Sequence, residues 1–115
     1  MQPERAVDRK ARVFVLEQQP FDYSPAKAYG ELVFLNTKKL APASTGAPDT
    51  WNNDVVHSLR KELSDYISDI DYIIPTGSPS RMVTVGAVLA SKGKRHRILG
   101  WDARTQRYLE YIINI

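Results

Sequence analysis

Bulky apolar residues occur along this chain in short runs, separated by stretches rich in Pro, Gly, Asn and Ser. A short apolar run bounded by turn residues indicates a strand that is buried on both faces. Three segments fit this description and predict strands: 11–18, 32–35 and 72–74. Between the first two, the sequence PAKAY at 25–29 predicts one helical turn closed by Gly30.

The stretch from Val55 to Ile67 has apolar residues at the spacing of an amphipathic helix, and residues 68–71 end it. Its candidate caps are Asn52, Asn53 and Asp54. The preceding segment, 36–53, contains Pro, Gly and Asn but few bulky apolar residues, which predicts a long loop. We expect Trp51 to pin this loop to the core rather than to bind a ligand.

A second helix is predicted over 82–91, with Gly93 just beyond its end. Two strands follow, 97–101 and 108–115, around a turn at 102–106. Apolar and polar residues alternate in the last strand, which predicts that one of its faces is exposed.

The resulting order, β-β-α-β-α-β-β, predicts an α/β fold with a small mixed sheet. Strands joined through helices pair in parallel by right-handed crossovers, so the centre is expected to be parallel, with a C-terminal antiparallel hairpin. We expect a single domain over 1–115, in which residues 1–10 form a charged N-terminal arm.

The composition supports a folded domain and excludes several kinds of chemistry. Of 115 residues, 43% are hydrophobic and 25% are charged, which is typical of globular proteins. The absence of cysteine excludes disulfides, Fe–S clusters and thiol nucleophiles. No apolar run reaches 18 residues and residues 1–12 lack a signal-like apolar stretch, so we expect a cytoplasmic protein with no membrane partner.

Charge is distributed unevenly along the chain. Residues 51–75 carry 2 Lys or Arg and 5 Asp or Glu, whereas residues 76–115 carry 7 and 2. The C-terminal third is therefore basic although the net charge of the chain is only +3. Such a division suits a polyanionic partner, but an ordinary solvated surface also produces it.

The sharpest local feature is PTGSPSR at 75–81, where a strand ends, a glycine turns the chain and a helix begins. Ser78 or Ser80 is the expected helix cap, with Pro79 near the first helical position. Free N–H groups at a helix N-terminus suit a phosphate or carboxylate. The candidate anion site consists of Thr76, Gly77, Ser78, Ser80 and Arg81. The same residues also suit a capped helix with no ligand, and the segment lacks the Walker lysine and the dinucleotide glycine pattern.

The basic C-terminal third also contains aromatic residues, the combination found in platforms that bind single-stranded nucleic acid. The candidate nucleic-acid site consists of Lys92, Lys94, Arg95, Arg97, Trp101, Arg104, Arg107 and Tyr108. We expect the loop and the strand ends to form one basic surface. The alternative is a solvated basic loop, with Trp101 part of the core.

Neither histidine has the neighbours of a metal ligand. His57 is followed by Arg60 and Lys61 at the helical positions where a second ligand would stand, and His96 lies between two arginines. Three carboxylates, Asp65, Asp69 and Asp71, are explained by solvation at a helix end. No G-x-S-x-G nucleophile motif occurs. We therefore predict no metal, no cofactor and no catalytic residue.

Three segments resemble small proteins encoded in bacteriophage genomes, which have an α/β fold and no settled activity. These are FDYSPAKAYGELVFL (21–35), DYIIPTGSP (71–79) and ILGWDARTQRYLEYIINI (98–115). The resemblance covers about residues 21–115 and implies an accessory or host-modifying role in the cytoplasm of an infected bacterium. It carries over no catalytic residue.

Three functions remain open at this point. The first is a non-enzymatic accessory protein that binds nucleic acid or a phosphorylated ligand through the turn at 76–81 and the basic C-terminal loop. The second is an assembly subunit that forms homo-oligomers, or docks on a host protein, through its C-terminal edge strand. The third is a small phosphate-handling enzyme that acts at the Thr76–Arg81 turn.

Overall fold

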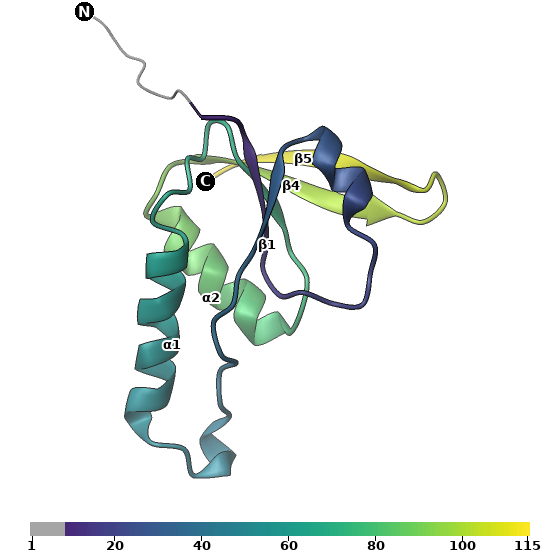
Figure 1. The fold of residues 1–115 in the computed structure, drawn as a ribbon. Helices are drawn as coiled ribbons and strands as arrows, with labels where there is room; N and C mark the ends of the chain where they lie inside the picture. The colour runs from purple at the N-terminus through teal and green to yellow at the C-terminus, as the bar shows by residue number, and fades with distance from the viewer. Residues whose placement is uncertain (1–8) are drawn as a thin grey trace, which may run out of the picture.

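The computed structural model describes residues 9–115, so most of the predicted N-terminal arm lies outside the described residues. The elements are β1 (Arg12–Val15), η1 (Ser24–Ala28), β2 (Glu31–Phe34), η2 (Ala43–Thr45), α1 (Asp49–Glu62), β3 (Tyr72–Ile74), α2 (Pro79–Ala90), β4 (Arg95–Asp102) and β5 (Arg107–Asn114). Figure 1 shows them gathered around one sheet, from which the β4–β5 hairpin projects on the side away from α1.

The five strands form a single mixed sheet in the order β2-β1-β3-β4-β5. The first four pair in parallel, and β4 pairs with β5 in antiparallel fashion. This arrangement confirms the predicted α/β fold with a parallel centre and a C-terminal hairpin. The chain runs from β1 outward to β2, then returns past β1 to β3 and β4.

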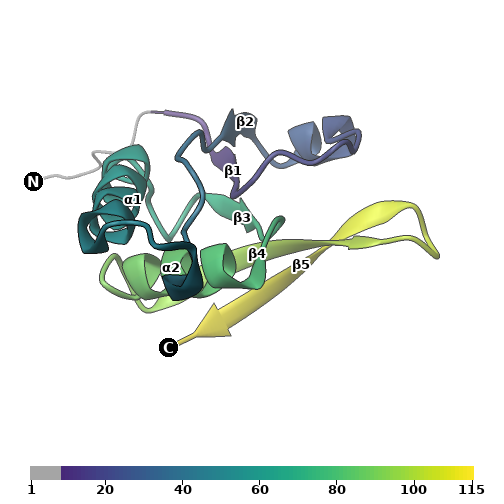
Figure 2. The same cartoon turned by 90° about the horizontal axis from the view of Figure 1, so that it is seen from below.

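Each face of the sheet has its own core. On one face, α1 and α2 cover Phe14, Leu16 and Ile73. On the other face, the 3-10 turn η1 packs its Ala26 against β1, β3 and β4. Figure 2 shows both α-helices on one side of the sheet and η1 on the other. The connection from β1 to β2 runs in one direction along the sheet, and those from β2 to β3 and from β3 to β4 run in the other, so right-handed crossovers require this division.

Helix α1 begins and ends earlier than the sequence predicts. Its N-cap is Pro48, so the expected caps at 52–54 lie inside the helix. Asn52 instead exchanges two hydrogen bonds with the backbone of Ala41 in the preceding loop. The helix ends at Glu62, and Leu63 and Tyr66 reach the core from turns beyond it. A proline with its φ angle fixed near helical values favours this early start.

Asp71 is fully buried, which corrects the prediction of a solvated helix-end carboxylate. Its carboxylate accepts hydrogen bonds from the guanidinium of Arg9, at 2.8 and 2.5 Å, and from the backbone N–H groups of Arg12 and Ile67. The hydrogen bond to Asp71 raises the pKa of Arg9. This aspartate therefore joins the start of β1 to the start of β3.

A second buried polar pair links the α1–β3 segment to β4. The Nδ1 atom of His96 lies 2.6 Å from the hydroxyl of Tyr66, and its Nε2 atom lies 2.8 Å from the carbonyl oxygen of Gly93. Burial raises the pKa of Tyr66 well above its ordinary value, and the charges of Asp71 and Asp69 add to the effect. His96 is therefore part of the core.

Strand β5 does not have the half-exposed pattern that its alternation predicts. Tyr108 is buried and Leu109 is half-buried, but every residue from Glu110 to Ile115 is exposed. The strand lies at the edge of the sheet, beyond the part that the helices cover. Its apolar residues therefore reach solvent on both faces.

Candidate functional site

The sheet has a topological switch point between β1 and β3, because the chain leaves these neighbouring strands in opposite directions. In open α/β sheets, ligands bind at such a point, beyond the carboxyl ends of the strands. Two segments meet there in this protein. One is residues 16–23, between β1 and η1, and the other is residues 75–78, between β3 and α2.

The turn after β3 is tied to the end of β1 by backbone and side-chain bonds. The hydroxyl of Thr76 donates to the carbonyl of Glu17 at 2.6 Å. Gly77 has a φ angle of +105°, and a Cβ atom there would lie 2.5 Å from the side chain of Glu17. Glycine is therefore needed both for the backbone conformation and for the close approach of Glu17.

Helix α2 has one of the two predicted caps, Ser78, with Pro79 at its first position, so it begins three residues before the predicted helical stretch 82–91. The Ser78 hydroxyl accepts a hydrogen bond from the backbone N–H of Arg81 at 3.3 Å, and it lies 3.3 Å from the hydroxyl of Ser80. Thr76, Gly77, Ser78 and Ser80 are thus together at the N-terminus of α2. The cap already satisfies one of the N–H groups that an anion would otherwise bind.

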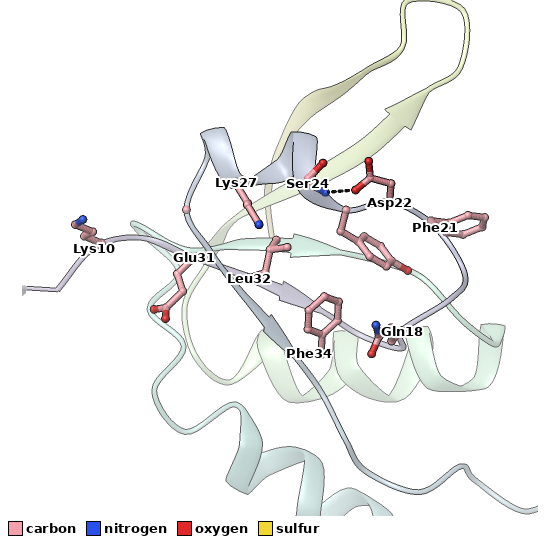
Figure 3. Close-up of a pocket in the computed structure, with 11 residues that line it drawn as sticks. Lys10, Gln18, Phe21, Asp22, Ser24, Lys27, Glu31, Leu32 and Phe34 are labelled. Atoms are coloured by element: carbon pink, nitrogen blue, oxygen red, sulfur yellow. Dashed lines mark hydrogen bonds between the residues drawn. The ribbon is translucent and has the colours of Figure 1, made fainter.

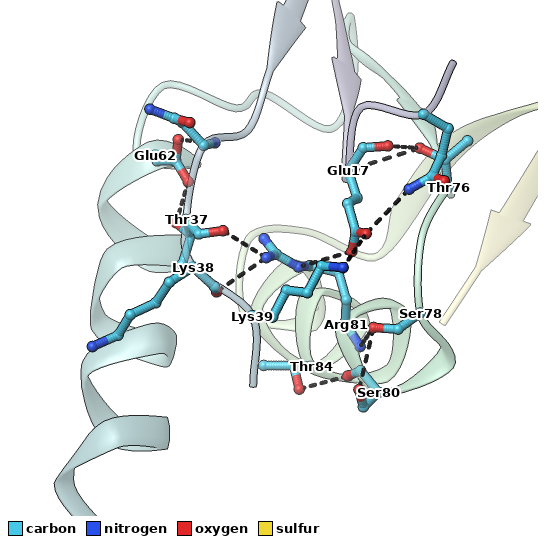
Figure 4. A network of polar contacts seen from close by, with 12 residues as sticks. Glu17, Thr37, Lys38, Lys39, Glu62, Thr76, Ser78, Ser80, Arg81 and Thr84 are labelled. Carbon is cyan, nitrogen blue, oxygen red and sulfur yellow. Dashed lines mark hydrogen bonds and ion pairs between the residues drawn. The ribbon is translucent and has the colours of Figure 1, made fainter. Parts of the chain in front are cut away.

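Arg81 does not point outward from this turn. Its side chain is only 3% exposed and runs under the loop that follows β2, as Figure 4 shows. Its Nη2 donates to the carbonyls of Thr37 and Lys38, at 2.6 and 3.0 Å, and its Nε lies 3.8 Å from the carboxylate of Glu17. The guanidinium therefore holds the β2–α1 loop against the sheet.

Glu17 supplies a negative charge beside the same turn. Lys39 lies 3.7 Å from its carboxylate, and the side chain of Gln19 donates to it at 3.1 Å. A hollow of about 550 Å³ opens beside these groups. It is lined by Glu17, Gln19, Phe21, Lys39, Pro75, Thr76, Gly77, Ser78 and Met82. We call it the turn hollow.

A larger cleft of about 750 Å³ adjoins the turn hollow and shares Phe21, Pro75 and Thr76 with it. The remaining lining residues are Pro20, Asp22, Tyr23, Pro25, Ile74, Leu99, Gly100, Trp101, Gln106 and Tyr108. We call it the aromatic cleft, because four aromatic side chains line it. Its volume falls in the range of small-molecule sites.

The aromatic rings of this cleft are partly fixed by one another. Trp101 packs edge-on against Tyr108 with ring centroids 5.0 Å apart, yet 46% of its surface is exposed. Burial raises the pKa of Tyr108 above its usual value, with smaller contributions from Tyr23 and Asp22. Trp101 therefore presents a ring surface to solvent at the edge of a preformed cleft.

A third hollow, shown in Figure 3, lies between β2 and η1 and has a volume of about 760 Å³. Its charged residues have both signs, namely Lys10, Lys27, Asp22 and Glu31. The Asp22 carboxylate accepts a hydrogen bond from the backbone N–H of Ser24, which lowers the pKa of Asp22. Phe21, Tyr23 and Phe34 also line this hollow, but its charges have both signs and neither Thr76 nor Ser78 lines it.

The structure does not gather the predicted basic residues into one surface. Lys92, Lys94 and Arg95 lie at the amino end of β4, whereas Arg104 lies in the turn after its carboxyl end. Seven further residues of β4 follow Arg95 before the turn begins, about 23 Å at the usual rise. Figure 1 shows β4 running along the hairpin to the turn that joins it to β5.

Two more of the predicted residues are separated from the cleft. Arg97 lies along β4, where its guanidinium is 5.7 Å from the ring of Tyr72 and 3.4 Å from its hydroxyl. Arg107 follows the turn, but side chains alternate along a strand, so it lies on the opposite face from Tyr108. Of the predicted nucleic-acid residues, Trp101 and Tyr108 alone line the cleft.

Sequence analysis missed several residues that line these hollows, above all Glu17, Phe21, Tyr23 and Lys39. Three of them lie at 17–23, the end of the predicted strand 11–18 and the residues that follow it, for which the sequence suggested no site. The available signal was the position of this segment directly after a buried parallel strand, where α/β proteins place their sites. Among residues 9–115, no group of three or more His, Asp or Glu could hold a metal ion.

Comparison with known proteins identifies one family. The family described as Phage Pam3 gp32-like protein matches residues 9–115, almost the whole chain. No curated protein matches this sequence, and no solved structure matches it. Within the part of the chain that the structure describes, no helix has the length and apolar character needed to cross a membrane.

Proposed function

The chain belongs to the Phage Pam3 gp32-like family, and we propose that it is a non-enzymatic accessory protein that binds nucleotides, free or within nucleic acid. The resemblance to small phage proteins that the sequence suggested is thereby confirmed. The ligand site of this proposal is the aromatic cleft together with the turn hollow.

One observation carries the proposal: an apolar aromatic cleft and a polar hollow adjoin at the switch point of the sheet. A nucleotide has the matching chemistry, because its planar base stacks on aromatic rings and its phosphate accepts hydrogen bonds. Trp101 offers a half-exposed ring at one end of this surface. Ser78 offers a hydroxyl group at the other end, near the amine of Lys39, which also lines the turn hollow.

The basic loop at the amino end of β4 lies too far from the cleft to contact the same mononucleotide. An extended strand of nucleic acid is long enough to reach from Trp101 along β4 to Lys94 and Arg95. Binding that strengthens with oligonucleotide length therefore indicates a nucleic-acid ligand. Binding that is complete with a mononucleotide indicates a free nucleotide.

The experiment measures binding of labelled mononucleotides and of single-stranded oligonucleotides of increasing length, each at two salt concentrations. In the variant Trp101→Ala we expect binding to weaken roughly 5- to 100-fold, the usual effect of removing one stacked base contact. The matched control is His57→Ala, because the ring of His57 is exposed on α1 and lines neither the aromatic cleft nor the turn hollow.

The double variant Arg95→Ala, Arg97→Ala separates the two ligand sources. For a nucleic-acid ligand, it weakens oligonucleotide binding and reduces the salt dependence of the affinity. For a free nucleotide, it leaves the affinity unchanged. The proposal fails if none of these ligands binds at low salt, or if Trp101→Ala binds as tightly as the unaltered protein.

A further inference from the structure

The edge strand β5 exposes a continuous apolar segment. Tyr111, Ile112, Ile113 and Ile115 are exposed by 53, 45, 40 and 66%. Soluble proteins usually protect an edge strand with lysine, proline, a bulge or a very short length. The opposite edge, β2, has only four residues, whereas β5 has eight and none of these protections between Tyr111 and Ile115.

The backbone of the same segment has hydrogen-bonding groups that face away from the sheet. The N–H of Ile115 donates to the carbonyl of Lys94 at 2.7 Å. Alternate residues of an antiparallel pair bond to the neighbouring strand, so the odd-numbered residues of β5 bond to β4. The N–H and C=O groups of Glu110, Ile112 and Asn114 therefore point toward solvent.

From these two observations we propose that β5 pairs in antiparallel fashion with β5 of a second copy of this chain, centred on Ile112. The pairing joins two five-stranded sheets into one continuous sheet about a two-fold axis. It satisfies the outward-facing backbone groups and covers the exposed apolar segment in both copies. It does not depend on the proposed nucleotide site.

The sequence of β5 favours a second copy as the occupant because it matches itself in this register. With Ile112 opposite Ile112, Tyr111 faces Ile113, Leu109 faces Ile115 and Glu110 faces Asn114 of the other copy. A shift of the centre to Tyr111 sets Glu110 opposite Ile112 instead. A shift to Glu110 sets two carboxylates opposite each other, which is unfavourable.

Two further contacts support the register centred on Ile112. The carbonyl of Tyr108 already accepts a hydrogen bond from the hydroxyl of Tyr29, and the register centred on Tyr111 would require Tyr108 to pair with Asn114 of the other copy as well. Arg95 pairs with Asn114 within one copy. In the dimer, Asn114 also faces Glu110 of the other copy, so Arg95 and that Glu110 lie on the same face of the sheet, about 10 Å apart. Their opposite charges add electrostatic complementarity to the interface.

Ile113 and Ile115 also line a small apolar hollow of about 120 Å³ against Met82, Val85 and Leu89 of α2 and its neighbours. In the proposed dimer, the Leu109 and Tyr111 side chains of the second copy lie beside this hollow. The apolar surface that neither helix covers is therefore continuous across the two-fold axis.

Sedimentation equilibrium tests the proposal on the unaltered chain, whose mass is 13.0 kDa. We expect twice this mass at high micromolar concentration. Ile112→Lys brings two lysines face to face and raises the dissociation constant roughly 100-fold. Because Ile112 is 45% exposed, this change leaves the fold intact, which circular dichroism checks. Trp101→Ala leaves the dimer unchanged, so this result is independent of ligand binding.

Single cysteine variants test the register, since the chain has no cysteine of its own. Ile112→Cys places two sulfurs across a hydrogen-bonded pair, with Cα atoms about 5.5 Å apart, and it forms a covalent dimer on oxidation. Ile115→Cys does not form a covalent dimer, because residue 115 faces Leu109 and lies six residues along the strand from residue 115 of the other copy. A monomer at every concentration overturns the proposal. So do a covalent dimer formed by Tyr111→Cys instead of Ile112→Cys, and an oligomer that survives Ile112→Lys.

Discussion

The guanidinium of Arg81 and the carboxylate of Glu17 meet beneath the turn that begins α2, with Nε and Oε1 3.8 Å apart. Both side chains are largely buried, and each also contacts the β2–α1 loop: Arg81 through two carbonyls and Glu17 through Lys39. The pair joins three segments that are distant in sequence. It also places a negative charge where the sequence alone suggested an anion.

The first prediction concerns this charge. In Glu17→Gln, the buried guanidinium of Arg81 loses its ionic partner, so the free energy of unfolding falls by about 2 kcal/mol. The affinity for a mononucleotide rises, because the carboxylate no longer repels the phosphate. Urea unfolding and nucleotide titration measure the two effects. Glu31→Gln removes an exposed carboxylate at the start of β2 and serves as the control. A lower nucleotide affinity in Glu17→Gln would indicate that the phosphate does not bind beside Glu17.

The second prediction concerns the glycine of the turn. Gly77→Ala forces a φ angle of +105° on a residue with a Cβ atom and displaces the side chain of Glu17. We expect a loss of about 2–4 kcal/mol in the free energy of unfolding. Gly46→Ala is the matched control, because Gly46 also has a positive φ angle but its added Cβ meets nothing within 4 Å. Equal losses in the two variants would show that the contact with Glu17 contributes nothing.

The third prediction concerns Asp71. Asp71→Asn removes the charge that pairs with Arg9 and weakens the bonds to the backbone of β1, so we expect a loss of about 3 kcal/mol. Thermal unfolding measures it as a lower Tm. Asp69→Asn, a change at an exposed position two residues away, leaves Tm nearly unchanged. A similar Tm for both variants would contradict a structural role for the buried carboxylate.

The fourth prediction is an alkaline loss of stability. Tyr66 has a raised pKa in the folded protein, so above a pH of about 10 the unfolded chain releases a proton that the folded chain retains. The free energy of unfolding therefore decreases as pH rises beyond that value. Tyr66→Phe removes this titration and flattens the decrease, although it costs about 1–3 kcal/mol at neutral pH by leaving His96 Nδ1 without its partner. Urea unfolding between pH 8 and 11 tests this, and parallel curves for the two proteins would refute it.

The central strands could be predicted from the sequence because Val13–Leu16 and Ile73–Ile74 are apolar at every position. Such runs fit the two-sided burial of a parallel sheet, and both are buried. The turn at Thr76–Ser78 could be predicted for a similar reason, since strand end, glycine and cap follow in order. These features depend on residues adjacent in sequence.

The orientation of Arg81 could not be predicted, because it depends on the loop that follows β2. An arginine in the first turn of a helix usually points to solvent, but here the carbonyls of Thr37 and Lys38 lie within its reach. The exposure of residues 110–115 in and after β5 could not be predicted from the sequence pattern either. Ile112 and Ile113 are adjacent, so their side chains lie on opposite faces of the strand, and the pattern does not decide which face is buried.

The pairing of β3 with both β1 and β4 has a consequence for how the chain folds. The β4–β5 hairpin connects neighbouring segments and can form locally, within microseconds. The pairs of β1 with β2 and β3 require the closure of long loops. During synthesis, β3 lacks one of its neighbours until residues 95–102 leave the ribosome. A chain arrested before that point exposes Ile73 and Ile74 along an open edge, and such a fragment is prone to aggregation.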